Sequence, residues 1–302
     1  MLVHDADTHR VAVRTIAGAR VIDCGLDVPG GLEAGMAMAE TCLGGLGRVS
    51  VVPHTASWTK GPAVCTQTDQ PMAACMASQY AGWQIAADGF FAMGSGPMRA
   101  AARKEKLFEQ IGYVETAPEI IGILETSKLP PEAICEQIAN DCGVPADKLT
   151  LLVAPTASLA GTIQVVARSV ETALHKMHEV GFDLSRVVSG FGSAPLPPVA
   201  ADDLTGIGRT NDAVLYGGEV TLWVRGDDDS LNSIGPRIPS SASADYGRPF
   251  KAIFESYDRD FYKIDPLLFS PAVVTLMNID SGGSFQFGET RPEVLSESFQ
   301  GM

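Results

Sequence analysis

The stretch between residues 155 and 182, PTASLAGTIQVVARSVETALHKMHEVGF, constrains the fold more than any other part of the chain. Its apolar residues recur at steps of three and four: Ile163, Val166, Val170, Leu174 and Met177. This spacing predicts one α-helix with a buried stripe. A second stripe is polar and has the same spacing: Gln164, Arg168, Glu171, His175 and His178. We therefore expect a central helix that holds the guanidinium of Arg168 beside the carboxylate of Glu171. A solvated helix face with a surface ion pair would show the same pattern.

The segments on either side of this helix favour an α+β fold. In the first half we expect a hairpin over residues 10–24, helices over 32–42, 72–87 and 132–143, and strands over 49–52, 113–124 and 149–153. In the second half, residues 189–198 are too rich in glycine and proline to predict regular structure, and strands are expected over 213–224 and 272–279. A chain of 302 residues has room for two domains. We predict a two-lobed mixed α/β protein, with an N-terminal lobe over 1–155 and a C-terminal lobe over 156–302 that carries the central helix. This boundary is approximate, and the lobes need not be continuous in sequence.

Charge and cysteine content narrow the class of protein. The formal net charge of −14 disfavours nucleic acid and anionic membranes as partners, because both attract lysine and arginine. The six cysteines form no Cys-x-x-Cys pair, which is typical of reduced thiols in a cytoplasmic protein. The N-terminus has no apolar signal segment, and no apolar run approaches the roughly 20 residues of a membrane span. We therefore expect a soluble, cytoplasmic protein.

A glycine-rich turn, Gly94-Ser95-Gly96, precedes a helix that begins near Arg99 and is basic in its first turns. Backbone N–H groups at such a turn suit a phosphate or carboxylate, and this is the one basic cluster of an acidic chain. A capped helix with a solvated basic face would look the same. The turn is neither a Walker loop nor a dinucleotide-binding fingerprint.

The polar residues favour general acid–base chemistry. His175 and His178 lie near Glu171 and Glu179 in sequence, but the chain has no His-Glu-x-x-His, so we expect no catalytic metal. No Gly-x-Ser-x-Gly elbow is present to predict a serine nucleophile. Glu171, Glu125 and Arg168 remain as candidates, with a glutamate taking a proton from water and the arginine fixing its geometry. Such chemistry needs a substrate that is already electrophilic.

Four runs of residues together resemble the methenyltetrahydromethanopterin cyclohydrolases: ARSVETALHK at 167–176, GSGPMR at 94–99, LETSKLP at 124–130 and GRTNDAVLYGG at 208–218. The resemblance spans nearly the whole chain. It implies a homotrimer of α+β subunits, each with its active-site cleft between two domains, that opens the methenyl bridge of a tetrahydropterin C1 carrier with water and uses no metal or other cofactor. By resemblance, Glu171 is the catalytic glutamate, Arg168 its arginine and Glu125 a second glutamate.

The resemblance also assigns substrate-binding residues: Gly94, Ser95, Gly96, Arg99, Ser193, Arg209, Asn211 and Asp212. Met98 departs from the small residue expected there in archaeal members, so contacts with the tail or the pterin are expected to differ at that position. Methanogenesis and bacterial formaldehyde oxidation are the two settings that the family implies, and the charge density favours the second. Two alternatives stay open: a cyclohydrolase or deaminase for another cyclic amidine such as methenyltetrahydrofolate, and a non-catalytic pterin-binding protein.

Overall fold

The computed structural model describes residues 2, 5–53, 61–80, 82–87 and 89–300. The chain divides into two compact units, the first formed by Met1–Leu46 with Met72–Gln164 and the second by Gly47–Pro71 with Val165–Met302. Residues 47–71 belong to the second unit because their two strands pair into its sheet. Each unit contains one mixed six-stranded sheet with helices, which confirms the α+β prediction.

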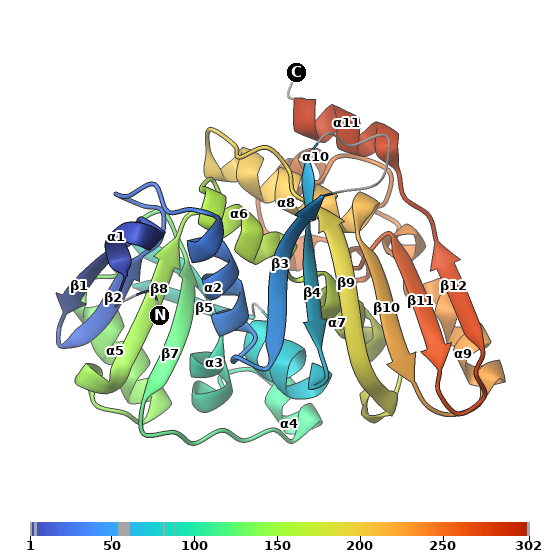
Figure 1. Cartoon of the computed structure of the whole chain (residues 1–302), viewed down its shortest axis with the longest axis horizontal. Coiled ribbons are helices and arrows are strands. Elements are labelled where there is room, and N and C mark those ends of the chain that lie inside the picture. Colours follow the sequence, from blue (N-terminus) through green and yellow to red (C-terminus); the bar gives the residue numbers. More distant parts are fainter. Residues whose placement is uncertain (1, 3–4, 54–60, 81, 88, 301–302) are drawn as a thin grey trace. The chain divides into compact units, whose positions relative to one another are not determined.

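The sheet of the first unit has the order β1-β2-β8-β7-β6-β5. Figure 1 labels its neighbouring strands β1, β2, β8 and β7. Its strands are β1 (Ala12–Ile16), β2 (Ala19–Asp23), β5 (Trp83–Ala87), β6 (Phe90–Ser95), β7 (Ile120–Glu125) and β8 (Leu149–Ala154). The predicted hairpin over residues 10–24 is confirmed, because β1 and β2 are antiparallel and turn at Gly18, whose φ of 85° suits glycine. The central strands β2, β8 and β7 are parallel, so their carboxyl ends lie at one edge of the sheet.

Helices cover both faces of this sheet. The helices of the first unit are α1 (Ala6–His9), α2 (Leu32–Cys42), α3 (Pro97–Ala102), α4 (Leu107–Ile111), α5 (Glu132–Cys142) and most of α6 (Leu159–Val166). On one face Val21 packs with Met98 of α3 and Ile134 of α5. On the other face Ile22 packs with Met38 of α2. Val21 and Ile22 are neighbours in β2 and point to opposite faces, as strand residues do.

The sheet of the second unit has the order β12-β11-β10-β9-β4-β3 (Figure 1). Its strands are β3 (Gly47–Pro53), β4 (Pro62–Thr68), β9 (Val187–Pro195), β10 (Glu219–Val224), β11 (Val273–Asn278) and β12 (Ser284–Gly288). Helix α7 (Ser169–Glu179) packs on β4, β9 and β10. The remaining helices are α8 (Asp203–Gly217), α9 (Asp228–Ile234), α10 (Phe250–Ser256) and α11 (Pro292–Gln300), of which α8, α10 and α11 share an apolar cluster.

The predicted central helix is two helices, not one. Helix α6 ends at Val166, and α7 begins at Ser169. Between them the N–H of Arg168 donates to the carbonyl of Val165, a tighter step than the α-helical one. The hydroxyl of Thr66 donates to the carbonyl of Ala167 at 2.9 Å, so a partner from β4 compensates the broken helical bonding. The predicted apolar stripe is confirmed, since all five of its residues are fully buried.

Four other sequence predictions were wrong in part. The strand predicted over 113–124 begins only at Ile120. The helix predicted over 72–87 is a π-helical segment, Met72–Gln79, followed by β5. The strand predicted over 213–224 begins at Glu219, because residues 213–217 complete α8. The basic helix after Gly96 is divided into α3 and α4, with Arg103 in the left-handed conformation between them.

The segment 189–198, for which no regular structure was predicted, is largely strand β9, paired with β4 on one side and β10 on the other. Two glycines of this strand, Gly190 and Gly192, lie against Val170 and Ser169 of helix α7. Among the residues that the structure describes, no helix is both long and apolar enough to cross a membrane.

Candidate active site

Arg168 and Glu171 lie at the start of α7, where Arg168 is the N-cap residue and Glu171 is in the first turn. Their side chains are only 6% and 4% exposed. The alternative of a solvated helix face is therefore wrong for these two residues. A carboxylate in the first turn is favoured by the helix dipole, whereas burial of a charge is costly unless it is compensated. A buried carboxylate in this setting is suited to proton transfer.

Helix α7 lies unusually close to the sheet of the second unit at this end. A Cβ atom on Gly192 of β9 would lie 2.3 Å from the hydroxyl oxygen of Ser169, and one on Gly190 would lie 2.6 Å from Cγ1 of Val170. Only glycine permits this approach, because real Cβ atoms essentially never come within 3.0 Å of a neighbour. Together with the bond from Thr66 to Ala167, the two glycines of β9 fix where the first turn of α7 lies.

Glu125 is the last residue of β7 in the first unit and is half-buried. The hydroxyl of Thr156 donates to its Oε1 at 2.5 Å, and Thr156 is itself buried. Thr156 follows β8, the parallel neighbour of β7, so the sheet register brings the two residues together. A half-buried carboxylate held by one short hydrogen bond keeps its other oxygen available as an acceptor.

Asp23 is the last residue of β2, which is also parallel to β8, and it is completely buried. Its carboxylate accepts the backbone N–H groups of Gly25, Leu26 and Asp27 at 2.7 to 2.9 Å. These bonds shape the turn that follows β2. In open α/β sheets, ligands bind outside the carboxyl ends of the strands, which is where Glu125, Thr156 and Asp23 lie in the first unit.

The glycine turn predicted to bind an anion has Gly94 and Ser95 in β6 and Gly96 as the N-cap of α3, with a φ of 87°. A Cβ on Gly94 would lie 2.8 Å from Cδ1 of Ile85 and 2.9 Å from Cε of Met98, so a larger residue there would require the ends of these two side chains to shift. Ser95 is buried, and its Oγ lies 3.2 Å from Sγ of Cys42. Binding of an anionic tail by this turn stays a prediction.

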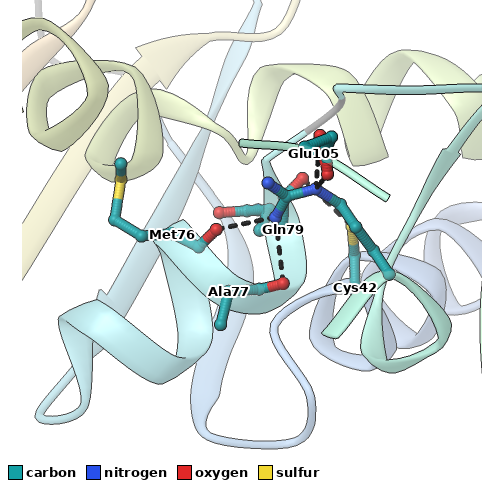
Figure 2. A network of polar contacts seen from close by, with 6 residues as sticks. Cys42, Met76, Ala77, Gln79 and Glu105 are labelled. Atoms are coloured by element: carbon teal, nitrogen blue, oxygen red, sulfur yellow. Dashed lines mark hydrogen bonds and ion pairs between the residues drawn. The ribbon is translucent and has the colours of Figure 1, made fainter. Parts of the chain in front are cut away.

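Arg99 is fully buried within the first unit. Figure 2 labels three of its partners, Met76, Ala77 and Glu105. The Nη1 of Arg99 donates to the carbonyls of Met76 and Ala77 at 2.6 and 2.9 Å, and its Nε pairs with Glu105. Burial raises the pKa of the Glu105 carboxyl, while the Arg99 charge opposes that rise. Arg99 thus ties the π-helical segment to the residues before α4. An anion that bound this guanidinium would compete with Glu105.

The remaining predicted substrate-binding residues lie in the second unit and make contacts within it. Ser193 is in β9, and its Oγ lies 3.6 Å from Sγ of Cys65. In α8, Arg209 donates to the carbonyls of Ser298 and Pro198, both at 3.2 Å. Asn211 donates to the carbonyl of Ile207 at 2.9 Å. The two bonds from Arg209 join α8 to the segments that contain Ser298 and Pro198. Substrate binding by these residues stays a prediction.

Asp212 is the fourth residue of this set and is completely buried. Its Oδ1 accepts the N–H of Phe250 at 2.7 Å, which caps α10. Burial raises the pKa of Asp212 to about 7, although hydrogen bonding from Ser298 and Phe250 opposes the shift. The carboxyl therefore joins α8 to α10.

Among the described residues, no group of three or more His, Cys, Asp or Glu side chains is placed to hold a metal ion. The six cysteines are free thiols, as expected, and burial raises the pKa of both Cys24 and Cys142 to about 12. The candidate residues of the first unit offer carboxylates and a hydroxyl, and those of the second unit offer a carboxylate and a guanidinium. These are groups for binding polar atoms and moving protons.

The comparisons with known proteins agree with this chemistry. A family model described as Cyclohydrolase (MCH) matches residues 1–299. A methenyltetrahydromethanopterin cyclohydrolase of Rhodopirellula baltica is 50% identical over 290 residues, 94% of this chain and 87% of that protein. One of Xanthobacter autotrophicus is 49% identical over 301 residues, 99% and 89% of the two chains. One of Methanospirillum hungatei is 44% identical over 283 residues, 93% and 89% of the two chains. With matches of this extent and identity, the chain belongs to the methenyltetrahydromethanopterin cyclohydrolase family.

Proposed function

We propose that the protein reversibly hydrolyses 5,10-methenyltetrahydromethanopterin, or its dephospho form, to the 5-formyl compound. The family match over residues 1–299 and the names of the relatives carry this proposal. The buried pair at the start of α7 supports it, because the methenyl carbon is part of an amidinium-like cation and needs only water and a base. We further propose that no metal or other cofactor takes part.

In the proposed mechanism Glu171 accepts one proton of a water molecule while the water oxygen bonds to the methenyl carbon. The bond from this carbon to one ring nitrogen then breaks, the electron pair stays on that nitrogen, and the proton held by Glu171 is delivered to it. The second water proton is released as the formyl C=O forms, so the cation and water give the formyl product and one proton. General acid–base help of this kind is worth about 100- to 10,000-fold.

Arg168 and Glu125 have supporting roles in this mechanism. Arg168 holds the Glu171 carboxylate in one geometry by charge attraction. Glu125 stabilises the cationic bridge or relays the proton, with Thr156 fixing its rotamer through the 2.5 Å bond. We also propose that the protein works as a homotrimer in the cytoplasm, in formaldehyde oxidation rather than methanogenesis. The resemblance to the family supports the trimer, and sedimentation analysis of the purified protein tests it.

The near-ultraviolet absorbance of the methenyl group reports the reaction directly. Chelator-treated protein is mixed with the methenyl form of either the methanopterin or the folate carrier, and the decay is compared with buffer. We expect rapid decay with the methanopterin carrier alone. Decay with the folate carrier alone would favour the other cyclic amidine as the substrate. Binding of the carriers without decay would favour a non-catalytic pterin-binding protein, and restoration by added metal would contradict the metal-free mechanism.

A further inference from the structure

Gln164 is a buried amide that the fold leaves without a partner. It lies in α6, its side chain is 1% exposed, and neither Oε1 nor Nε2 has a hydrogen-bond partner among the residues that the structure describes. An unsatisfied buried polar group costs about 1–3 kcal/mol, and a carboxamide has a donor and an acceptor to satisfy. Such a group in a native protein requires an explanation, of which a ligand or an ordered water are the usual ones.

Its neighbours on the same helix are satisfied internally. The only other polar residue of α6, Thr162, donates to the carbonyl of Thr156 at 3.1 Å. Ser158, just before the helix, both donates to the carbonyl of Pro155 and accepts the N–H of Gly161. A shortage of partners is therefore not general in this part of the first unit. Within α6 it is confined to Gln164, whose amide has both a donor and an acceptor.

A buried amide elsewhere in the chain shows how the fold satisfies such a group when its role is structural. Asn278, at the end of β11, is 2% exposed. Its Nδ2 donates to the carbonyl of Gly226 at 2.7 Å and to Asp228 at 2.6 Å, and its Oδ1 accepts the N–H of Asp280 at 3.0 Å. Gln164 has the same chemistry, is as deeply buried and has none of these bonds.

The place of Gln164 in the sequence connects it with the candidate catalytic residues. The turn that leads into α6 contains Thr156, the partner of Glu125. Four residues after Gln164 the chain reaches Arg168, and Glu171 follows three residues later. Along the chain, Gln164 therefore follows the segment that contains Thr156 and precedes the segment that contains Arg168 and Glu171.

We propose that Gln164 binds the lactam edge of the pteridine ring of the C1 carrier. A carboxamide presents a donor and an acceptor side by side in one plane, and the N–H and C=O of a cyclic amide present the complementary pair. A neutral amide suits this neutral edge better than an anionic tail, which offers acceptors only and is bound more strongly by charged donors. This assignment rests on the proposed function, because it takes a pterin carrier as the substrate.

Substitution of Gln164 by Met, which has a similar length and no polar atoms, tests the proposal. Because the amide of the free protein is unsatisfied, Gln164→Met is expected to raise the melting temperature by about 2–4 °C. The same change is expected to lower kcat/KM for the methenyl carrier by about 10- to 100-fold, and to reduce the thermal stabilisation that tetrahydromethanopterin gives the wild type. Stability and ligand binding then change in opposite directions, which a purely structural residue does not produce.

Asn278→Leu is the matched control, since it removes a buried amide that is fully bonded. It is expected to lower the melting temperature and to leave KM unchanged. A lower melting temperature or failure to fold in Gln164→Met would overturn the proposal, because the amide would then be satisfied in the free protein, for example by water. A raised melting temperature with unchanged kcat/KM and unchanged carrier stabilisation would also overturn it. If the wild type has no turnover but is stabilised by the carrier and the variant is not, the proposed function fails and the role of Gln164 stands.

Discussion

Replacement of Gly192 by alanine is expected to disable the candidate site without touching a catalytic group. The added Cβ would lie 2.3 Å from Oγ of Ser169 and 3.0 Å from Cγ2 of Val170, whereas ordinary contacts begin at 3.4 Å. Relief of the shorter contact requires either a new rotamer of Ser169 or a displacement of about 1 Å at the first turn of α7, and both Ser169 and Val170 are fully buried. Overpacking of this kind costs about 1–3 kcal/mol of stability.

The effect on catalysis is expected to exceed the effect on folding. A misplacement of about 1 Å at reacting groups costs about 100-fold in rate. We therefore expect Gly192→Ala to lower kcat by about 10- to 100-fold while the protein stays folded at 25 °C. The assay is the decay of methenyl absorbance at saturating substrate, with the melting temperature measured on the same samples.

Two further variants make this prediction specific. Ser169→Ala removes the atom at 2.3 Å, so it is expected to restore much of the kcat lost in Gly192→Ala when the two changes are combined. Gly31→Ala is the control, because a Cβ there meets nothing within 4 Å and its φ of 175° is extended backbone. Wild-type kcat in Gly192→Ala, or no recovery in the double variant, would refute the idea that the contact of α7 with β9 positions Glu171.

Three other substitutions test the supporting contacts. Thr66→Val removes the 2.9 Å bond to Ala167 and is expected to cost about 1–3 kcal/mol in chemical denaturation and to lower kcat more than KM; an equal loss in Gly31→Ala would contradict this. Thr156→Val removes the 2.5 Å bond to Glu125 and is expected to reduce kcat/KM about 10-fold with little change in melting temperature, whereas unchanged kinetics would exclude a role for this bond. The pKa of Asp212 is raised to about 7 in the folded protein, whereas in the unfolded chain this carboxyl loses its proton near pH 4. The stability that this group contributes therefore falls as the pH rises from about 4 to 7. Asp212→Asn is expected to flatten that part of the profile of melting temperature against pH, and an unchanged slope would contradict the assignment.

The local sequence was sufficient to predict those helices and strands whose own residues show the spacing or the glycines that define them. The hairpin over residues 10–24 followed from alternation and a glycine at the turn, and helix α2 from the glycine pairs at 30–31 and 44–45 before and after it. The stripe of α6 and α7 was predicted correctly, because its apolar residues in both helices are fully buried. Their separation was not predictable, because it depends on Thr66, a residue 101 positions earlier in the chain.

The glycines of β9 were misinterpreted, because their role is in packing against another element and not in local backbone conformation. In β9, Gly190 and Gly192 suggested a loop, since glycine weakens a strand considered alone. The structure places them under the first turn of α7, where a side chain would prevent packing. Nothing in the local sequence distinguishes a glycine needed for close approach from one needed for a turn.

Candidate site residues could be predicted where charged side chains follow helical spacing. They could not be predicted where a hydrogen-bond partner comes from a distant segment of the chain. Arg168 and Glu171 were found from their spacing, and burial at the start of α7 gives them a setting suited to proton transfer. Thr156 was missed because its role depends on the pairing of β7 with β8. Gln164 was noticed as part of a polar stripe, but only its burial without a partner gives it a distinct role.

The most direct measurement is the turnover of Glu171→Gln with the methenyl form of the methanopterin carrier. The change keeps the shape of the side chain and removes its capacity to take a proton. Glu179→Gln is the matched control on the same helix, since the Glu179 side chain is 39% exposed. We predict that Glu171→Gln retains carrier binding and loses at least about 100-fold in kcat, while Glu179→Gln stays within about twofold of the wild type. Wild-type turnover in Glu171→Gln would contradict the proposal that this carboxylate activates the water.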